Sequence, residues 1–397
     1  MLYPKQQEIY KEIKDNFLVP AGTGSGKTII ALLYYLNNHL NKNLYVIAPA
    51  AKVNEGGWDR ELQTLCLKYM VKLPKYKVVS YSNLDKYKDE LKEGFYILDE
   101  AHYIKNPTAK RSKNIVSIID DNPFLMLTAT PGTRIEEFTN YFILWKLNKN
   151  KTDFYNNYII QTVNNKFYGR EFLEITGYKN EDIFNNLLKE HSTSRINVND
   201  IVELPAMIHN YKYFKKTKDY TDVLNDRVIT INGELTPLDT QMKLCSVLRK
   251  IVSAKQKLEY LKYIKENLGE DNLLIFYNFN YERDLIVDAI GCDYVINGFV
   301  KNYPRKDSFN DIKSKVTLVQ ISAGGTGIEL QYNSKVVYYS PTYSYQDYEQ
   351  SLGRAYRPGQ DKKVIVYKFK TLDTIEEDVW NALERKEDFN EKLWESK

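Results

Sequence analysis

The sequence predicts an α/β protein with two doubly wound parallel sheets and a helical segment between them. Two observations lead to this fold class: short, nearly continuous apolar runs occur in two groups, and helical patterns fall between the runs. Buried parallel strands read this way because both of their faces are covered. Strands that alternate with helices are typical of a doubly wound sheet, here built twice. At 397 residues, the chain is long enough for two to three domains with cores of their own.

The first group of apolar runs predicts five strands, and a helical pattern follows the first of them over residues 28–40. The runs are Phe17–Pro20, Leu44–Ala48, Tyr76–Ser80, Phe95–Leu98 and Phe124–Leu127. The second group predicts five more strands, preceded by a helix over residues 248–268 that Gly269 is expected to stop. Its runs are Leu273–Phe276, Tyr294–Ile296, Val316–Ile321, Lys335–Tyr339 and Val364–Phe369.

The composition changes between the two groups, where Asn, Lys, Tyr and Glu dominate and a weaker periodicity is helical. We therefore expect a first lobe over residues 1–145, a helical protrusion and connector over 146–245, and a second lobe over 246–397.

Charge and cysteine usage exclude several classes of protein. The 56 basic and 52 acidic residues leave a net charge of +4, which excludes an acidic solvating chain and does not by itself indicate a nucleic-acid binder. Three scattered cysteines and four histidines show no metal-ligand spacing, so we expect reduced thiols and no zinc site. The N-terminus is charged from Lys5 onward and no apolar run reaches the ~18 residues of a membrane span. We expect a soluble, cytoplasmic protein without membrane contact.

Residues 21–28 read AGTGSGKT and connect an apolar strand to a helical segment. This is the context of a phosphate-binding loop, because glycines let backbone N–H groups converge on an anion at the positive end of a helix. Lys27 is expected to reach the β- and γ-phosphates, and the Thr28 hydroxyl to hold Mg²⁺. The loop predicts ATP and Mg²⁺ as ligands, with the cofactor-binding residues Gly22, Thr23, Gly24, Ser25, Gly26, Lys27 and Thr28.

An acidic pair follows the strand that ends near residue 98, where the sequence reads Asp99-Glu100-Ala101-His102. Parallel sheets bind ligands at the carboxyl ends of their strands. Asp99 is therefore expected to hold Mg²⁺, and Glu100 to act as general base toward the attacking water. His102 either senses the γ-phosphate or links to the next strand. Without the phosphate loop, two acids at this place would usually indicate the N-terminal turn of a helix.

These motifs resemble the superfamily 2 helicases, and further motifs narrow the resemblance to the Swi/Snf-type helicase-like ATPases, of a small phage or bacterial kind. The motifs stand in order over residues 2 to about 380: LYPKQ at 2–6, AGTGSGKT at 21–28, Trp58 with Glu61, DEAHYIKNP at 99–107, TATP at 128–131, SAGGTG at 322–327 and QSLGRAYRPGQ at 350–360. One departure is Glu329, where the family usually has Asn. The chain is short for the family, which favours a minimal motor over a nucleosome remodeller.

The resemblance implies two RecA-like lobes that face each other across an ATP cleft. The second lobe would supply the catalytic residues Arg354 and Arg357 as arginine fingers with Gln350 beside them, although a solvated helix face is the plain alternative. Gln6 would read the adenine edge, and Tyr3 either stacks on the ring or packs in the core. The residues that would couple hydrolysis to lobe closure are His102, Thr128, Thr130, Gly325 and Gly327.

Nucleic-acid contacts are predicted at a basic run just after the acidic pair, because tracking a phosphate backbone needs positive charge and no base code. The run comprises Lys105, Lys110, Arg111 and Lys113, and a second run comprises Lys212, Lys215, Lys216 and Lys218. Both runs read equally as solvated helix faces. The tyrosines at 338–348 either offer stacking platforms or, as we favour, end a strand and pack a loop.

The sequence therefore predicts a DNA-dependent ATPase that translocates on double-stranded DNA, as a monomer with unidentified replication or recombination partners. One alternative is a strand-separating DNA or RNA helicase of the same superfamily. A different class of function is a nucleotide-gated binding protein without turnover, against which an intact Glu100 and both arginines argue.

Overall fold

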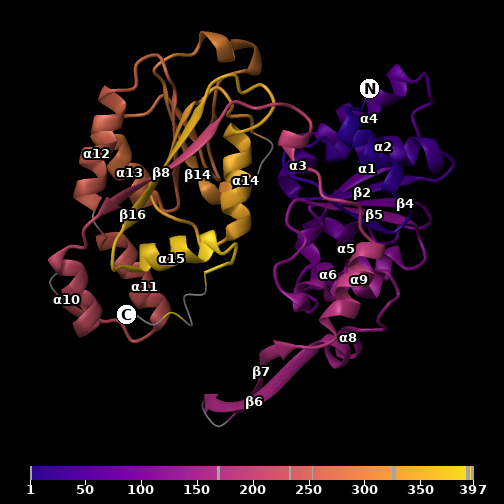
Figure 1. Cartoon of the computed structure of the whole chain (residues 1–397), viewed down its shortest axis with the longest axis horizontal. Coiled ribbons are helices and arrows are strands. Elements are labelled where there is room, and N and C mark those ends of the chain that lie inside the picture. The colour runs from indigo at the N-terminus through magenta and orange to yellow at the C-terminus, as the bar shows by residue number, and fades with distance from the viewer. Residues whose placement is uncertain are drawn as a thin grey trace. The chain divides into compact units, whose positions relative to one another are not determined.

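The computed structural model describes residues 2–167, 170–231, 234–252, 254–323, 328–389 and residue 394. The chain divides into two compact units, Met1–Glu203 and Leu204–Lys397, shown in Figure 1. The division falls inside the segment 146–245, for which we expected a separate helical protrusion and connector. That segment instead contributes to both units and contains strands as well as helices.

The first unit is built on a five-stranded, wholly parallel sheet with the strand order β1-β5-β4-β2-β3. All five strands predicted for this part of the chain are present. Their bounds are β1 Phe17–Pro20, β2 Leu44–Ala48, β3 Tyr76–Ser80, β4 Phe95–Asp99 and β5 Phe124–Thr128.

Helices cover both faces of this sheet because neighbouring strand residues point to opposite sides. In β4, Ile97 packs with helices α1, α2 and α4, whereas Tyr96 and Leu98 pack with α5 to α9. Figure 1 shows the two layers above and below the sheet. The bounds are α1 Pro4–Glu12, α2 Lys27–Asn38, α3 Ala50–Asn54, α4 Gly57–Lys68, α5 Leu84–Tyr87, α6 Lys110–Ile119, α7 Thr139–Leu144, α8 Lys151–Tyr158 and α9 Glu181–Glu190.

An antiparallel hairpin, β6 (Ile159–Phe167) and β7 (Arg170–Tyr178), projects from the first unit beyond α8 (Figure 1). Its first strand reads IIQTVNNKF, and the spacing of four between Ile159, Val163 and Phe167 resembles a helical period rather than the period of two of a strand. The chain then returns to the sheet, where Ser192 bridges to Leu18 and Ile196 to Ala21. These contacts explain why the unit extends past the predicted lobe end at residue 145.

The second unit carries a seven-stranded sheet with the order β13-β12-β14-β11-β15-β16-β8, parallel except for the pair β12–β13. The five predicted strands are present as β11 Leu273–Tyr277, β12 Tyr294–Ile296, β14 Val316–Gln320, β15 Lys335–Tyr338 and β16 Val364–Thr371. The two-residue strand β13 (Lys301–Asn302) and the edge strand β8 (Met207–Phe214) were not predicted. A further hairpin consists of β9 (Val228–Ile231) and β10 (Glu234–Pro237).

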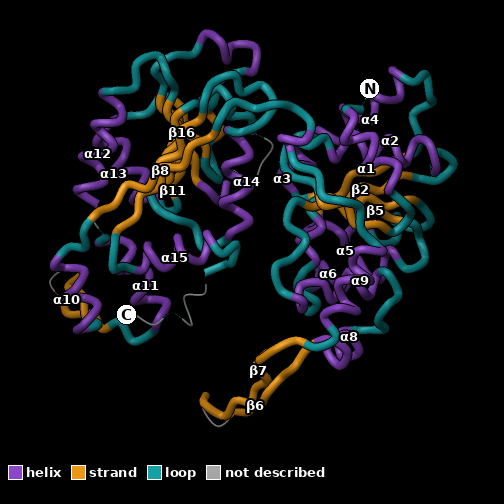
Figure 2. Tube along the Cα trace, viewed as in Figure 1, coloured by secondary structure: helices purple, strands orange, loops and turns teal. Residues whose placement is uncertain are grey.

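Helices again lie on both faces of the second sheet, α12 and α13 on one and α11, α14 and α15 on the other (Figure 2). The single helix expected over 248–268 is two helices, because Val252 adopts an extended backbone conformation between them. The bounds are α10 Lys218–Asp226, α11 Gln241–Ile251, α12 Ala254–Glu266, α13 Asn280–Ile290, α14 Tyr345–Ala355 and α15 Ile375–Glu384.

The tyrosines at 338–348 belong to the core of the second unit, as we favoured. Tyr338 and Tyr339 are buried at the end of β15, and Tyr348 is buried on α14. The three cysteines are free, two of them buried. Within the described ranges, no helix has both the length and the apolar character needed to cross a membrane.

Candidate active site

The candidate site lies where the carboxyl ends of four parallel strands meet in the first unit. The phosphate loop leaves β1 after Pro20, and the acidic pair straddles the end of β4. Thr128 ends β5, and β2 ends at Ala48. Because parallel strands present all their carboxyl ends at one edge, the fold brings these segments together.

The loop is a tight turn tied to the sheet and capped by the start of α2. The Ser25 hydroxyl donates to the Gly22 carbonyl at 2.7 Å, and the Gly22 amide donates to the Ile196 carbonyl at 2.9 Å. Gly24 and Gly26 have φ values of 79° and 76°, in the left-handed region that favours glycine. Since α2 begins at Lys27, the turn presents a helix N-terminus of the kind that binds phosphate.

Gln6 lies against this loop from α1. Its side-chain amide donates to the Ser25 carbonyl at 2.9 Å, and its Oε1 accepts from the Tyr3 amide at 3.0 Å. A Cβ atom on Gly26 would stand only 2.3 Å from Gln6 Nε2, so a larger residue there would have to displace the Gln6 amide as well as adopt a positive φ. Gln6 is buried, whereas the Tyr3 side chain is half exposed.

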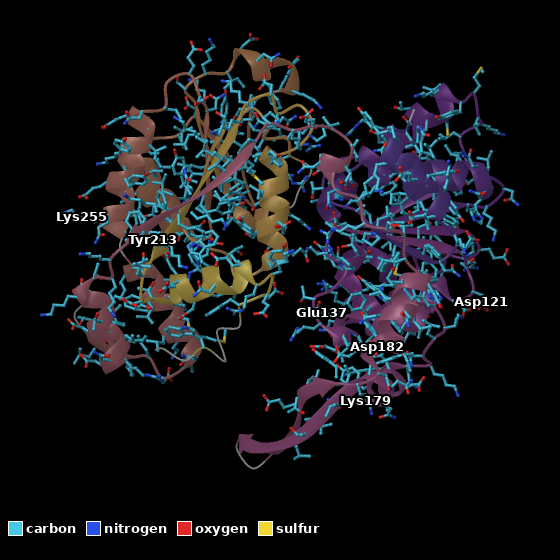
Figure 3. The ribbon with its side chains drawn as sticks, in the orientation of Figure 1. Asp121, Glu137, Lys179, Asp182, Tyr213 and Lys255 are labelled. Carbon is cyan, nitrogen blue, oxygen red and sulfur yellow. The ribbon has the colours of Figure 1, made fainter. Side chains whose placement is uncertain are left out.

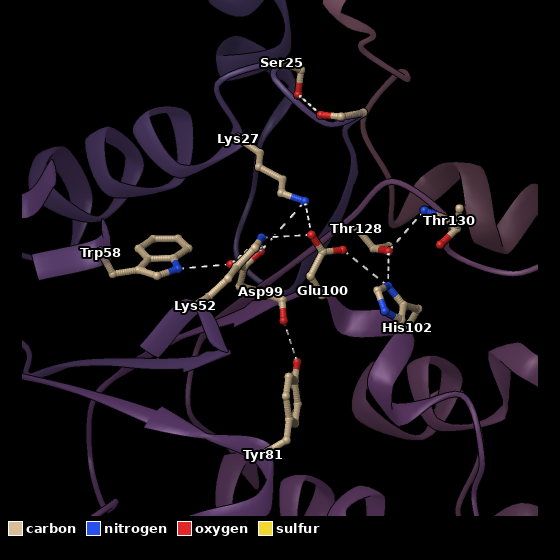
Figure 4. Close-up of polar contacts among 11 residues, drawn as sticks. Ser25, Lys27, Lys52, Trp58, Tyr81, Asp99, Glu100, His102, Thr128 and Thr130 are labelled. Carbon is tan, nitrogen blue, oxygen red and sulfur yellow. Dashed lines mark hydrogen bonds and ion pairs between the residues drawn. The ribbon is translucent and has the colours of Figure 1, made fainter. Parts of the chain in front are cut away.

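Lys27 and the acidic pair form one buried charge cluster (Figure 4). Lys27 Nζ lies 2.6 Å from Glu100 Oε1 and 3.9 Å from Asp99 Oδ1. Asp99 is fully buried and Glu100 nearly so. The structure therefore brings the loop lysine to both predicted carboxylates. Thr28 follows on the first turn of α2 and is partly exposed.

A second lysine, Lys52 on α3, completes the cluster and was not among the predicted site residues. Its Nζ lies 3.0 Å from Asp99 Oδ2, 3.2 Å from Asp99 Oδ1 and 2.9 Å from Glu100 Oε1. The indole Nε1 of Trp58 donates to Asp99 Oδ2 at 3.0 Å. The signal that points to Lys52 is its place just after the end of β2, the neighbour of β4 in the sheet.

Glu100 is held in an unusual backbone conformation and in its ionised form. Its φ of 54° and ψ of 53° place a non-glycine residue in the left-handed region, a strain that clusters at functional sites. Burial alone would raise the pKa of the Glu100 carboxyl, but Lys27, Lys52 and their hydrogen bonds outweigh burial and hold the pKa well below its usual range. Its Oε2 is buried and accepts no hydrogen bond from the described residues.

His102 connects the acidic pair to the end of β5. Its Nδ1 lies 3.0 Å from the Thr128 hydroxyl and 3.4 Å from Glu100 Oε2, and the Thr128 hydroxyl accepts from the Thr130 amide at 3.2 Å. Burial lowers the pKa of His102 to about 4, although the Glu100 charge opposes the shift. The imidazole is thus neutral near pH 7. Of the two roles considered for His102, this geometry favours the link to the next strand.

The second unit carries the predicted arginines on and just after α14, where Gln350 also lies. Arg354 is buried, and its carbonyl accepts from the Leu330 amide. Arg357 Nη2 lies 3.3 Å from Glu329 Oε1, and Lys306 Nζ lies 3.0 Å from the other oxygen of the same carboxylate. Glu329, the departure from the family pattern, therefore holds one of the two predicted fingers. Gly325 and Gly327 lie outside the described residues.

Some residues of the basic run predicted to bind nucleic acid form ion pairs or ring contacts within the first unit. Lys105 Nζ lies 3.2 Å from Oε2 of Glu137, a residue that Figure 3 labels, and Lys110 Nζ lies 2.6 Å from Asp85 Oδ2. The Arg111 guanidinium stands 5.3 Å from the centre of the Tyr103 ring. Lys110, Arg111 and Lys113 are exposed along α6. These residues face solvent on the first unit, as either of the two interpretations requires.

Comparisons with known proteins found one domain match and relatives that align along nearly the whole chain. The helicase conserved C-terminal domain matches residues 256–359. The uncharacterized ATP-dependent helicase YqhH of Bacillus subtilis is 23% identical over 439 residues, which cover 98% of this chain and 78% of that protein. Protein CHROMATIN REMODELING 19 of Arabidopsis thaliana is also 23% identical, with 95% of this chain and 66% of that protein covered.

Among solved structures, the SWI2/SNF2 ATPase core of Sulfolobus solfataricus in complex with double-stranded DNA covers 97% of this chain. The two share 17% identity with a TM-score of 0.43, and the match covers 91% of that chain. The domain match lies in the unit that carries Arg354 and Arg357, whereas the relatives align along nearly the whole chain.

Proposed function

We propose that the chain is a Swi/Snf-type helicase-like ATPase of superfamily 2, which hydrolyses ATP at the carboxyl edge of the first sheet and thereby moves along double-stranded DNA. One observation carries the catalytic part of the proposal. The phosphate-loop lysine, Lys27, and the acidic pair Asp99–Glu100 meet in one buried cluster beside the N-terminus of α2.

The cluster fits Mg²⁺ and the phosphates of ATP. Both oxygens of Asp99 already face cationic groups, and hard carboxylate and hydroxyl oxygens are the donors that Mg²⁺ prefers. Asp99 and Thr28 would hold the metal, which when bound neutralises phosphate charge. Lys27 and the amides of residues 22–28 would hold the phosphates. Gln6, fixed beside the loop, would contact the base.

Glu100 is positioned to act as the general base. Its Oε1 is bound by two ammonium groups, whereas its Oε2 accepts no hydrogen bond from the described residues. That oxygen remains able to accept a proton from a water molecule. The neutral His102 lies beside this oxygen and contacts the Thr128 hydroxyl, which in turn accepts a hydrogen bond from the Thr130 amide. These contacts would transmit a change at Glu100 to β5 and the segment that follows it.

The second unit would supply Arg354 and Arg357, whose charge stabilises the transferred phosphoryl group. Within the described residues, Arg357 Nε is buried and donates no hydrogen bond. This N–H group would be available to donate to a phosphate oxygen. The exposed basic residues of α6 would track the DNA backbone. The proposal includes a monomeric motor in the cytoplasm of a bacterial or phage-infected cell, and the Bacillus relative supports the bacterial setting alone.

Translocation on duplex DNA is favoured over strand separation by the family-like runs at 104–107 and 350–360 and by the chromatin-remodelling name of one relative. A strand-separating DNA or RNA helicase is the alternative. A triplex-displacement assay beside a forked-duplex assay discriminates between the two. We expect ATP-dependent release of the third strand with little unwinding of the fork, and efficient fork unwinding would overturn translocation without strand separation.

A further inference from the structure

The strongest unexplained feature of the candidate site is the second lysine. Lys52 makes three hydrogen bonds of 2.9 to 3.2 Å to the acidic pair, two of them to Asp99. Lys27 lies closer to Glu100 than to Asp99, with 2.6 Å against 3.9 Å. Lys52 therefore contacts both carboxylates and is the principal cation on Asp99, whereas Lys27 contacts mainly Glu100.

The fold places Lys52 there by topology. Strands β2 and β4 pair in parallel from Leu44↔Phe95 to Ile47↔Leu98, so the chain leaves β2 beside the end of β4. Pro49 ends the strand, and the five-residue helix α3 turns Lys52 back over Asp99. The side chain of Lys52 is 19% exposed, against 9% for Lys27 and 0% for Asp99. Lys52 thus reaches the buried carboxylate from the solvent side and has a path away from it.

A metal bound to Asp99 would have to share the two carboxylate oxygens with Lys52, which already contacts both. Mg²⁺ binds carboxylate oxygens at about 2.0–2.1 Å in near-octahedral geometry, whereas an ammonium group occupies them at hydrogen-bond distance. Trp58 already uses one lone pair of Asp99 Oδ2. An ammonium group on both oxygens and a divalent metal on one of them also repel each other. Binding of one cation at Asp99 therefore weakens binding of the other.

We propose that Lys52 is a displaceable internal cation that competes with Mg²⁺ for Asp99, so that it neutralises the acidic pair between nucleotide-binding events and sets the Mg²⁺ concentration that the site requires. This inference rests on the proposed ATPase function. Lys52 acts as a positioning residue: it holds the side chains of Asp99 and Glu100 in place without metal, and it must leave Asp99 when the metal binds.

The test is the Mg²⁺ dependence of nucleotide binding, measured by fluorescence anisotropy of a labelled ATP analogue with the full chain. The variant Lys52→Met keeps the length of the side chain and removes its charge. We expect its Mg²⁺ midpoint to fall about tenfold, the change expected for loss of one charge-assisted contact of this class. Lys68→Met on the exposed face of α4 is the matched control and should keep the wild-type midpoint.

An unchanged or raised midpoint in Lys52→Met would overturn the competition, and a raised one would instead make Lys52 a support for the metal site. Lys52→Gln, which retains a hydrogen-bond donor, provides the same test should the methionine variant fail to fold. Thermal melting adds a readout without nucleotide: Mg²⁺ alone should stabilise Lys52→Met more than the wild type. If the wild type itself binds no Mg²⁺-nucleotide, the proposed function fails; if it binds and no midpoint moves, only this inference fails.

Discussion

At the scale of single residues, the site is a balance of buried charge. The ammonium groups of Lys27 and Lys52 face the carboxylates of Asp99 and Glu100 at hydrogen-bond distance, with one contact at 3.9 Å. Removing one partner of such a buried cluster leaves an uncompensated charge, which destabilises strongly. Substitutions here therefore need to preserve shape while changing charge or proton affinity.

Replacing Glu100 with Gln should separate binding from chemistry. The amide keeps the size of the side chain and can still contact Lys27 only through its carbonyl oxygen, but it cannot accept a proton from water. We expect nucleotide affinity within a few-fold of the wild type and ATP turnover reduced by roughly 10²–10⁴-fold. Turnover near the wild-type rate, measured by phosphate release, would remove Glu100 from the role of general base.

His102 predicts a pH dependence of stability. Its folded pKa of about 4 lies below the ordinary value of 6.5, so between these pH values the unfolded chain binds more protons than the folded chain. The contribution of His102 is complete above pH 6.5 and is lost as the pH falls toward 4, on the order of 3 kcal/mol. His102→Asn should lose less unfolding free energy over this window in urea titrations. Parallel curves for the two proteins would contradict the shift.

At this scale the sequence was sufficient to predict that Lys27, Asp99 and Glu100 lie together. A glycine-rich turn and an acidic pair, each following an apolar run, place them at one sheet edge. Lys52 could not be predicted in the same way, since one lysine after a strand has no distinguishing pattern. Its contact with Asp99 depends on β2 lying next to β4, which is a property of the sheet order.

At the scale of elements, continuous apolar runs identified the ten core strands because both faces of those strands are buried. Strand β8 escaped because it lies at the edge of the second sheet and carries His209, Asn210 and Lys212 within a mixed burial pattern. Tyr213 on this strand, labelled in Figure 3, is likewise more than half exposed. An edge strand pairs with one neighbour only and leaves its other edge open to solvent. Its sequence therefore lacks the apolar continuity of the other strands.

The phosphate loop offers a prediction that a matched pair of glycines can test. Gly26→Ala should lower nucleotide affinity and the melting temperature, because φ is 76° and the new methyl group would stand 2.3 Å from Gln6 Nε2. The left-handed backbone alone costs about 1 kcal/mol or more for a non-glycine residue. Gly57→Ala at the start of α4, with no atom within 4 Å of the new methyl group, should retain wild-type binding. Equal behaviour of the two variants would contradict the strained turn.

At the scale of the whole molecule, two units each carry a doubly wound sheet, as the two groups of apolar runs predicted. The boundary after Glu203 was harder to predict because the segment 146–245 is shared between the units. Its first half packs back on β1, and β8 joins the second sheet through β16. Such long-range pairings carry no local signature in the sequence.

The two proposed arginine fingers, Arg354 and Arg357, lie in a different unit from the phosphate loop. Arg354→Ala and Arg357→Ala should each reduce turnover by up to about 10³-fold, with nucleotide affinity of the first unit nearly unchanged. Because Glu329 pairs with Arg357, Glu329→Gln should alter turnover while leaving that affinity intact. A wild-type rate of phosphate release in either arginine variant would remove that arginine from the finger role.

The most direct test of the central claim is steady-state ATP hydrolysis by the full chain with double-stranded DNA, single-stranded DNA and RNA compared side by side. We expect hydrolysis that double-stranded DNA stimulates most strongly and that Glu100→Gln reduces by roughly 10²–10⁴-fold under all conditions. Hydrolysis that no polymer stimulates, or that RNA alone stimulates, would contradict a motor that works on duplex DNA.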